Sequence, residues 1–288
     1  MIVITGITGQ VGGVVARQLL AAGKKIRAVV RNAGKGAIWA QQGCEIAEAE
    51  INDADALSRA FAGADAVFAM IPPNFDPSPG FPEVRQTIAA LRKALGDARP
   101  SRVVCLSTIG AQATQTNLLS QLGMMECELG TLPMPVAFLR AAWFMENSLW
   151  DVRPARETGI IPSFLQPLEK PVPMIATEDV GRTGAELLLD TWNGVRIVEL
   201  EAARRIAPQE IGETFARLLG RDVRMEAVPR DTWEALFRSQ GMKNPMPRIQ
   251  MIDGFNEGWI EFEGGEAGSR QGNVSLETVL RTLIGRNA

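Results

Sequence analysis

The first 140 residues alternate short runs of β-branched residues with segments whose apolar residues recur at helical spacing. The expected strands are residues 2–5, 25–30, 44–47, 66–71, 102–107 and 136–139. The expected helices are residues 11–22, 36–42, 54–61, 82–95 and 118–130. Alternating strands and helices form a parallel sheet covered on both faces, because each crossover helix packs back onto the sheet. The pattern therefore predicts an α/β fold with a doubly wound parallel sheet of six strands.

The regular alternation ends near residue 141, where proline, tryptophan and methionine become frequent. We therefore expect a doubly wound domain at residues 1–140 and a smaller α/β lobe at residues 141–288, packed together and sharing some elements. In the second part, the patterns predict strands at 197–200 and 223–228 and helices at 177–189, 208–219, 231–240, 247–261 and 276–284.

A glycine-rich turn joins the first expected strand to the first expected helix, with Gly6, Gly9 and Gly12 in G-x-x-G-x-x-G spacing. Gly6 suits a tight turn, Gly9 lets backbone N–H groups approach a diphosphate, and Gly12 lets the helix pack closely on the sheet. The positive end of the helix dipole also favours an anion here. The turn predicts a dinucleotide site in a Rossmann-type fold, and its other expected contact residues are Thr8, Gln10 and Val11.

Basic residues follow the second expected strand. Arg31 comes directly after it, next to Asn32, and Lys35 lies four residues farther on. Sites for NAD usually carry an acidic residue here, whereas arginine accommodates the 2′-phosphate of NADP. A guanidinium fork and an ammonium group bracket a phosphate well. These residues predict NADP(H) rather than NAD(H), and a solvated pair on an exposed loop is the alternative.

The ends of the next strands complete the expected cofactor site, because ligands of such sheets bind beyond the carboxyl ends of the strands. Asp53 is either an adenine contact or the N-cap of the following helix. Ile71, Pro72 and Pro73 begin a proline-dense loop that we expect to wall the site where cofactor and substrate meet. Ser107 ends the fifth expected strand, within reach of a nicotinamide or a carbonyl group.

The chain contains no histidine and no tyrosine. Ser-His-Asp and Cys-His pairs and histidine-bearing zinc sites are therefore excluded, and no metal is expected. Any proton must come from another side chain, from water or from the substrate. The catalytic residues stay unidentified: Ser107, Glu146 and Asn147 are weak candidates, and a structural role such as a helix cap is the favoured interpretation of Glu146 and Asn147.

Charge and hydropathy exclude other classes of protein. The 30 Lys and Arg residues balance 33 Asp and Glu residues without a block of like charge, which argues against dedicated nucleic-acid binding. No apolar run reaches the roughly 18 residues of a membrane span, and no secretory signal peptide is recognisable. The three cysteines are far apart. These features predict a cytoplasmic protein with no membrane partner, and a homodimer stays open.

The glycine turn resembles that of the short-chain dehydrogenase/reductase superfamily, whose members typically use a Tyr-x-x-x-Lys pair. The expected helix 118–130 holds neither residue type. The chain is more similar to the NmrA-like family, whose members are atypical short-chain reductases. The similar residues are Arg31 with Lys35, Leu139-Arg140 followed by Phe144 to Asn147, and residues 175–180 and 208–221. Leu122 departs from the lysine or histidine that several members place four residues before the position of Glu126. The resemblance implies an NADPH-dependent quinone or triphenylmethane-dye reductase, although the family also includes regulators that bind dinucleotide without turnover.

A site without tyrosine or histidine suits conjugated electrophiles, which accept hydride with little help from a protein acid. The leading interpretation is an NADPH-dependent oxidoreductase acting on a quinone-like small molecule. The alternatives are a non-catalytic NADP(H)-sensing regulatory protein and a pathway-specific biosynthetic reductase of an aromatic or polyketide intermediate. A flat acceptor would lie against apolar side chains near the functional edge of the sheet, four of them from the second lobe, unless these form the core between the lobes: Phe75, Trp143, Phe144, Met145 and Phe164.

Overall fold

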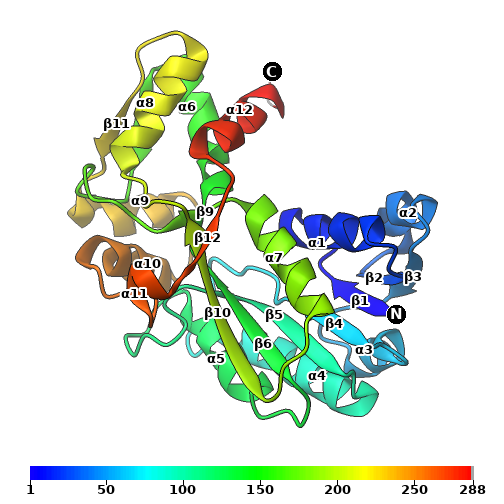
Figure 1. Ribbon diagram of the computed structural model, residues 1–288. Helices are drawn as coiled ribbons and strands as arrows, with labels where there is room; N and C mark the ends of the chain where they lie inside the picture. Colours follow the sequence, from blue (N-terminus) through cyan, green and yellow to red (C-terminus); the bar gives the residue numbers. More distant parts are fainter. Residues whose placement is uncertain (287–288) are drawn as a thin grey trace.

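The computed structural model describes residues 1–286 and has an eight-stranded sheet at its centre (Figure 1). The strand order is β12-β10-β6-β5-β4-β1-β2-β3, and every neighbouring pair is parallel. The direction of winding reverses between β1 and β4. Ligands of doubly wound sheets bind at such a switch point, beyond the carboxyl ends of the strands.

The strands of this sheet are β1 (Ile2–Thr5), β2 (Ile26–Val30), β3 (Glu45–Glu48), β4 (Ala66–Ala69), β5 (Arg102–Thr108), β6 (Val136–Ala141), β10 (Val195–Ala202) and β12 (Arg270–Gly272). One face is covered by α1 (Gln10–Ala21), α2 (Ala33–Gln41) and α7 (Thr177–Leu189). The other face is covered by α3 (Ala54–Phe61), α4 (Pro82–Ala98) and α5 (Ser120–Leu129). Burial on both faces explains why β1 and β4 consist wholly of buried residues.

Helix α7 returns from the second half of the chain and packs against α1. Gly181 makes this contact possible, because a Cβ atom there would lie 2.4 Å from Cβ of Val14. A Cβ atom on Gly184, one turn later, would approach Phe68 and Val15 at 3.1 and 3.3 Å. Glycines on the inner face of α7 therefore set how closely the second half of the chain approaches the first.

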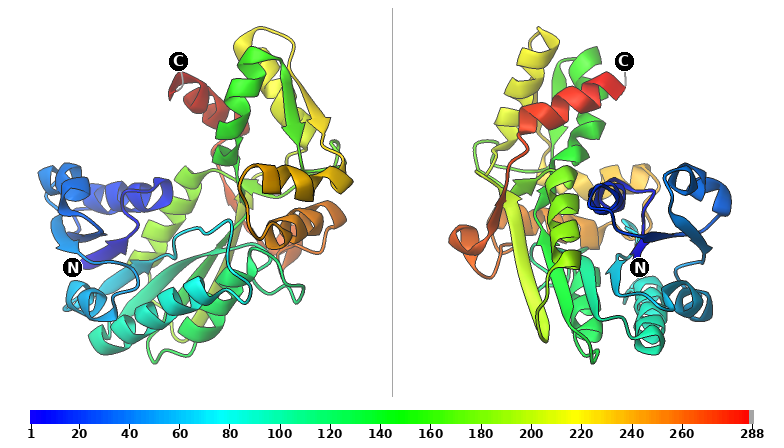
Figure 2. Two further views of the ribbon diagram at one scale, coloured as in Figure 1. Left: turned by 180° about the vertical axis from the view of Figure 1, so that it is seen from behind. Right: turned by 45° about the vertical axis from the view of Figure 1, so that its right-hand side comes forward.

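Outside the central sheet the chain forms two short parallel pairs, β7 (Trp143–Phe144) with β9 (Met174–Ile175) and β8 (Ile160–Ser163) with β11 (Arg224–Ala227). The helical elements of the second half of the chain, apart from α7, are η1 (Met145–Asp151), α6 (Val152–Glu157), α8 (Pro208–Leu219), η2 (Arg230–Thr232), α9 (Trp233–Ser239), α10 (Met246–Glu257), α11 (Gly265–Gly268) and α12 (Leu276–Arg286). Figure 2 shows α8, α6 and α12 rising above the sheet, with α9 and α10 below them.

The predicted doubly wound α/β sheet is confirmed, but the sheet is larger than expected. Strands β10 and β12 extend it beyond β6, so the strand expected at 197–200 belongs to the central sheet. Helix α2 begins at Ala33 instead of residue 36 because the Asn32 side chain caps it. The shortest elements, such as β7, β9 and α11, were not predicted, because segments of two to four residues are too short to show a periodic pattern of apolar residues. Within residues 1–286, every helix is too short or too polar to cross a bilayer.

Candidate functional site

The glycine turn brings the end of β1 and the start of α1 into close contact. Gly6 has φ 65°, a left-handed conformation that glycine adopts without strain, and its carbonyl oxygen accepts the Gly9 N–H at 2.9 Å. A Cβ atom on Gly12 would lie 2.3 Å from the same carbonyl oxygen. The roles expected for Gly6 and Gly12 therefore correspond to real geometric demands of the turn.

The N-terminus of α1 is exposed and has no side-chain cap. Gly9 is the N-cap residue, and the first turn contains no acidic residue. Thr8, Gly9 and Gln10 are exposed, whereas the Val11 side chain lies in the core and leaves only its backbone for a ligand. Unpaired N–H groups at the positive end of a helix dipole form an anion site. This turn therefore fits a diphosphate.

Arg31 and Lys35 lie beside this turn, since Arg31 follows the last residue of β2, the neighbour of β1. Both side chains are exposed, and within residues 1–286 neither forms an ion pair. Asn32 is engaged in capping α2, where its Oδ1 accepts the Gly34 N–H at 2.8 Å. Two free cations therefore stand where the second strand ends.

A carboxylate that the sequence reasoning missed also lies at this position. Oε2 of Glu48, the last residue of β3, accepts the Ala33 N–H at 2.9 Å and so occupies the first turn of α2. Its position at a strand end was the signal that could have found it. Asp53 caps α3 by accepting the Ala56 N–H at 2.9 Å, so the N-cap interpretation of this residue is correct and its contact with adenine stays a prediction.

The loop after β4 lies over the same edge of the sheet. Ile71 is buried, whereas Pro72 and Pro73 are exposed. Farther along, Asp76 accepts the backbone N–H groups of Lys243 and Asn244 at 2.9 and 2.7 Å. The loop, cyan in the rear view of Figure 2, thus connects the end of β4 to the segment before α10.

Ser107, near the end of β5, belongs to a buried polar cluster. Its hydroxyl donates to Oε1 of Glu126 on α5 at 2.5 Å. Arg140 on β6 donates to the same carboxylate, with Nη2 2.7 Å from Oε2, and also pairs with Glu199 and Glu263. The carboxylates around it raise the pKa of Arg140 against the opposing effect of burial. Because Ser107 donates to Glu126, its oxygen remains available only as an acceptor toward a ligand.

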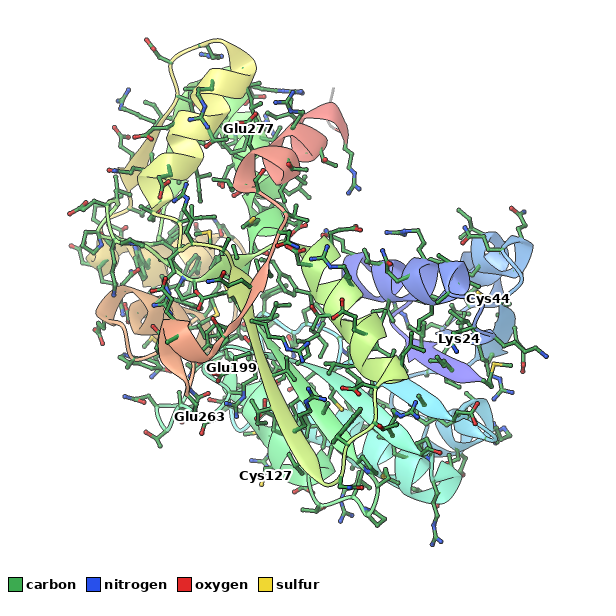
Figure 3. All side chains as sticks on the ribbon, in the orientation of Figure 1. Lys24, Cys44, Cys127, Glu199, Glu263 and Glu277 are labelled. Carbon is green, nitrogen blue, oxygen red and sulfur yellow. The ribbon has the colours of Figure 1, made fainter. Side chains whose placement is uncertain are left out.

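The acidic members of this cluster come from distant segments. Glu199 lies on β10 and Glu263 precedes α11, and Figure 3 places these two residues on adjoining segments. Glu199 also accepts the backbone N–H groups of Glu263 and Gly264 at 2.9 and 3.0 Å. Sequence patterns could suggest the place of Arg140 at a strand end, but not these partners.

Glu146 caps the N-terminus of α7. Its carboxylate accepts the Thr177 N–H at 2.9 Å and the Thr177 hydroxyl at 2.7 Å, and this hydroxyl lies 3.2 Å from Oε1 of Gln10. Burial raises the pKa of Glu146. Glu146 therefore connects α7 to the glycine turn, while the neighbouring Asn147 is exposed.

Two of the expected substrate contacts belong to aromatic clusters that involve α9 or α10. Trp143 packs edge-to-face against Phe255 of α10, with ring centroids 5.3 Å apart. Phe164 packs against Trp233 and Phe237 of α9, with centroids 5.4 and 5.0 Å apart. Both rings are only partly buried, so each combines packing with an accessible surface.

The other expected substrate contacts differ in exposure. Phe75, on the loop after β4, is 60% exposed. Phe144 is half-buried, and Met145 is 1% exposed and packs in the core. The structure therefore leaves part of Phe75 and Phe144 exposed, whereas Met145 is a core residue, so the expectation that its side chain contacts the substrate is not met. Within residues 1–286, no cluster of three or more Cys, Asp and Glu side chains is suited to a metal ion.

Comparison with known proteins relates this arrangement to reductases. An NAD(P)H azoreductase from Xenophilus azovorans is 25% identical over 259 residues, which cover 89% of this chain and 85% of the relative. Quinone oxidoreductase 2 from Escherichia coli is 23% identical over 247 residues, covering 84% of this chain and 82% of the relative.

A solved structure agrees on the fold. The Citrobacter sp. triphenylmethane reductase complexed with NADP(H) superimposes with a TM-score of 0.81 at 20% identity, covering 98% of this chain and 99% of that one. The model of the NmrA-like family matches residues 1–261, which include the glycine turn, Ser107 with Glu126 and Arg140, and α10. The chain therefore belongs to the NmrA-like family.

Proposed function

We propose that this protein is an NADPH-dependent reductase that delivers hydride to a quinone-like or other conjugated electrophile. The observation that carries the proposal is the uncapped N-terminus of α1 beside the two free cations Arg31 and Lys35. Membership of a family with reductase relatives supports it. When bound, the cofactor supplies the hydride, and the protein supplies binding, orientation and exclusion of water.

The residues present fit NADP(H). The backbone N–H groups of Gln10 and Val11 would hold the diphosphate, because they lie at the exposed start of α1, whereas the Gly9 N–H already donates to the Gly6 carbonyl oxygen. Arg31 and Lys35 would bind the 2′-phosphate with the fork of one side chain and the point charge of the other. Glu48 at the start of α2 would disfavour a phosphate placed too close to that helix.

The polar groups near the strand ends offer a substrate little acid catalysis. Both oxygens of Glu126 accept hydrogen bonds from Ser107 or Arg140, so this carboxyl group has no free position that faces a ligand. Glu146 is similarly engaged by Thr177. An acceptor that needs no protein acid, such as a quinone, an azo compound or a triarylmethane dye, matches these constraints.

The test is NADPH oxidation by the purified protein, followed by absorbance with and without such acceptors. Acceptor-dependent oxidation that disappears in Gly9→Val supports the proposal, because the added side chain fills the space that the diphosphate needs. The same variant controls for a contaminating reductase. Stoichiometric NADPH binding without oxidation across the panel would favour a sensor of NADP(H), and oxidation confined to one complex aromatic compound would favour a biosynthetic enzyme.

A further inference from the structure

Arg248, in the first turn of α10, is a partly buried cation without a carboxylate partner. Within residues 1–286 it forms no ion pair. Its guanidinium carbon lies 4.6 Å from the centroid of the Phe237 ring, and Nη1 lies 3.8 Å from the sulfur of Met242. A thioether is a weak acceptor, so most of the five N–H donors of Arg248 have no strong partner.

This situation distinguishes Arg248 from the other arginines that are not fully exposed. Each of those donates to a carboxylate or a backbone carbonyl: Arg27, Arg102, Arg140, Arg156, Arg182, Arg196 and Arg205. Taking a guanidinium out of water without an anion is unfavourable, and burial lowers the pKa of Arg248. A partly buried guanidinium without an anionic partner is suited to bind an anionic group of a ligand.

The position of Arg248 places it at the ligand-binding edge of the sheet. The carbonyl of Pro247, the preceding residue, accepts the Leu118 N–H at 2.8 Å from the segment after β5. The nearby Asn244 donates to Asp76 in the loop after β4. The start of α10 is therefore held between the loops that follow two central strands, where a hydride acceptor would meet the cofactor.

The surroundings of Arg248 are aromatic. Phe237, beneath its guanidinium, packs against Phe164 at 5.0 Å. Phe255, seven residues along α10 and so on the same face, contacts Trp143 just beyond β6. Phe237 and Phe255 are themselves buried, so the aromatic surface open to a ligand near Arg248 belongs to their partly exposed partners, Phe164 and Trp143.

We propose that Arg248 binds an anionic substituent of the acceptor, so that the substrate class is a flat conjugated molecule carrying a carboxylate, sulfonate or phosphate group. The partly exposed rings of Trp143 and Phe164 contact the conjugated body, and the guanidinium fork receives the anion. This assignment rests on the proposed reductase function and narrows its range of substrates.

The kinetic test compares a naphthoquinone sulfonate with the same naphthoquinone lacking the sulfonate. In Arg248→Gln we expect kcat/KM for the sulfonated acceptor to fall about 10- to 100-fold, and that for the neutral acceptor to change less than about twofold. Arg248→Lys should retain part of the preference, because it keeps the charge but loses the fork. Arg59→Gln is the matched control and should behave as wild type, because Arg59 is an exposed arginine of α3 that forms no ion pair within residues 1–286.

An equal loss for both acceptors, or an unchanged preference, would overturn the assignment. A binding measurement separates it from the reductase proposal. Naphthalene sulfonate, which cannot be reduced by hydride, is titrated against tryptophan fluorescence, with naphthol as the neutral comparison. We expect wild type to bind the sulfonate at least about tenfold more tightly and Arg248→Gln to lose the difference. Equal binding of both probes by wild type would refute the anion site even if NADPH oxidation were established. Should Arg248→Gln not fold, the comparison of the two probes on wild type still decides the assignment.

Discussion

Arg140 on β6 forms a two-pronged ion pair with Glu126 on α5, with Nη2 2.7 Å from Oε2 and Nε 3.0 Å from Oε1. Glu126 in turn accepts the hydroxyl of Ser107 on β5. The same guanidinium also reaches Glu199 on β10. One arginine therefore connects three strands and a helix at the edge of the sheet where the cofactor is expected.

Replacing Arg140 with methionine should strongly destabilise the fold. The change leaves Glu126 and Glu199 buried without their cation, and removing one partner of a buried pair costs about 3–5 kcal/mol. Urea unfolding followed by circular dichroism measures this loss. Arg153→Met is the control, because its pair with Glu157 is exposed and contributes at most about 0.5 kcal/mol. Similar small effects from both variants would contradict a stabilising role for the cluster.

Replacing Arg31 with alanine should change cofactor preference. The dissociation constant for NADPH should rise about 10- to 100-fold, while that for NADH changes less than about twofold, because only NADPH carries the 2′-phosphate. Tryptophan fluorescence titration gives both constants. Lys24→Ala is the matched control, since Lys24 lies before β2 at the opposite edge of the sheet (Figure 3). Equal weakening of both cofactors would remove Arg31 from the phosphate site.

Replacing Gly12 with alanine should strain the glycine turn. The new methyl group would lie 2.3 Å from the Gly6 carbonyl oxygen, so α1 must move away from β1. Overpacking of this kind costs about 1–3 kcal/mol, and the displaced helix should also bind NADPH more weakly. Gly96→Ala in α4, where a Cβ atom meets nothing within 4 Å, should be neutral or slightly stabilising. Thermal unfolding compares the stabilities of the two variants. A Gly12→Ala variant as stable as wild type would show that the turn accommodates a Cβ atom at this position.

Asp151 at the end of η1 should make stability depend on pH. Burial raises its pKa to about 6, although a hydrogen bond with Ser148 opposes the shift. The folded protein therefore favours the neutral carboxyl group, and this contribution is complete below the unfolded pKa near 4 and lost as pH rises through about 6.

Asp151→Asn removes this titration. Its free energy of unfolding relative to wild type should increase between about pH 4 and pH 7, by at most about 3 kcal/mol. Urea unfolding of both proteins at several pH values gives the difference directly. A difference that is constant with pH, or one that decreases, would show that Asp151 ionises at least as readily in the folded protein as in the unfolded chain.

The sequence by itself determined those helices, strands and turns that depend only on residues close to one another in the chain. The glycine spacing set the β1–α1 turn, Pro208 at the first position of α8 marked the start of that helix, and the strand ending before Arg31 placed this cation at the edge of the sheet. Turn geometry, capping and periodicity are short-range effects, so a single sequence carries them.

The tertiary structure decided which distant groups meet. It brought Glu199 and Glu263 to Arg140, placed Glu146 at the start of α7, and added β10 and β12 to the central sheet. It also decided that, within residues 1–286, Arg248 lies over the Phe237 ring without an ion pair, because the nearby carboxylates are engaged elsewhere: Asp76 by the backbone of Lys243 and Asn244, and Glu234 by Arg238. Such contacts join segments separated by tens of residues or more, and no local pattern specifies them, because their free energy arises only when packing removes the groups from water.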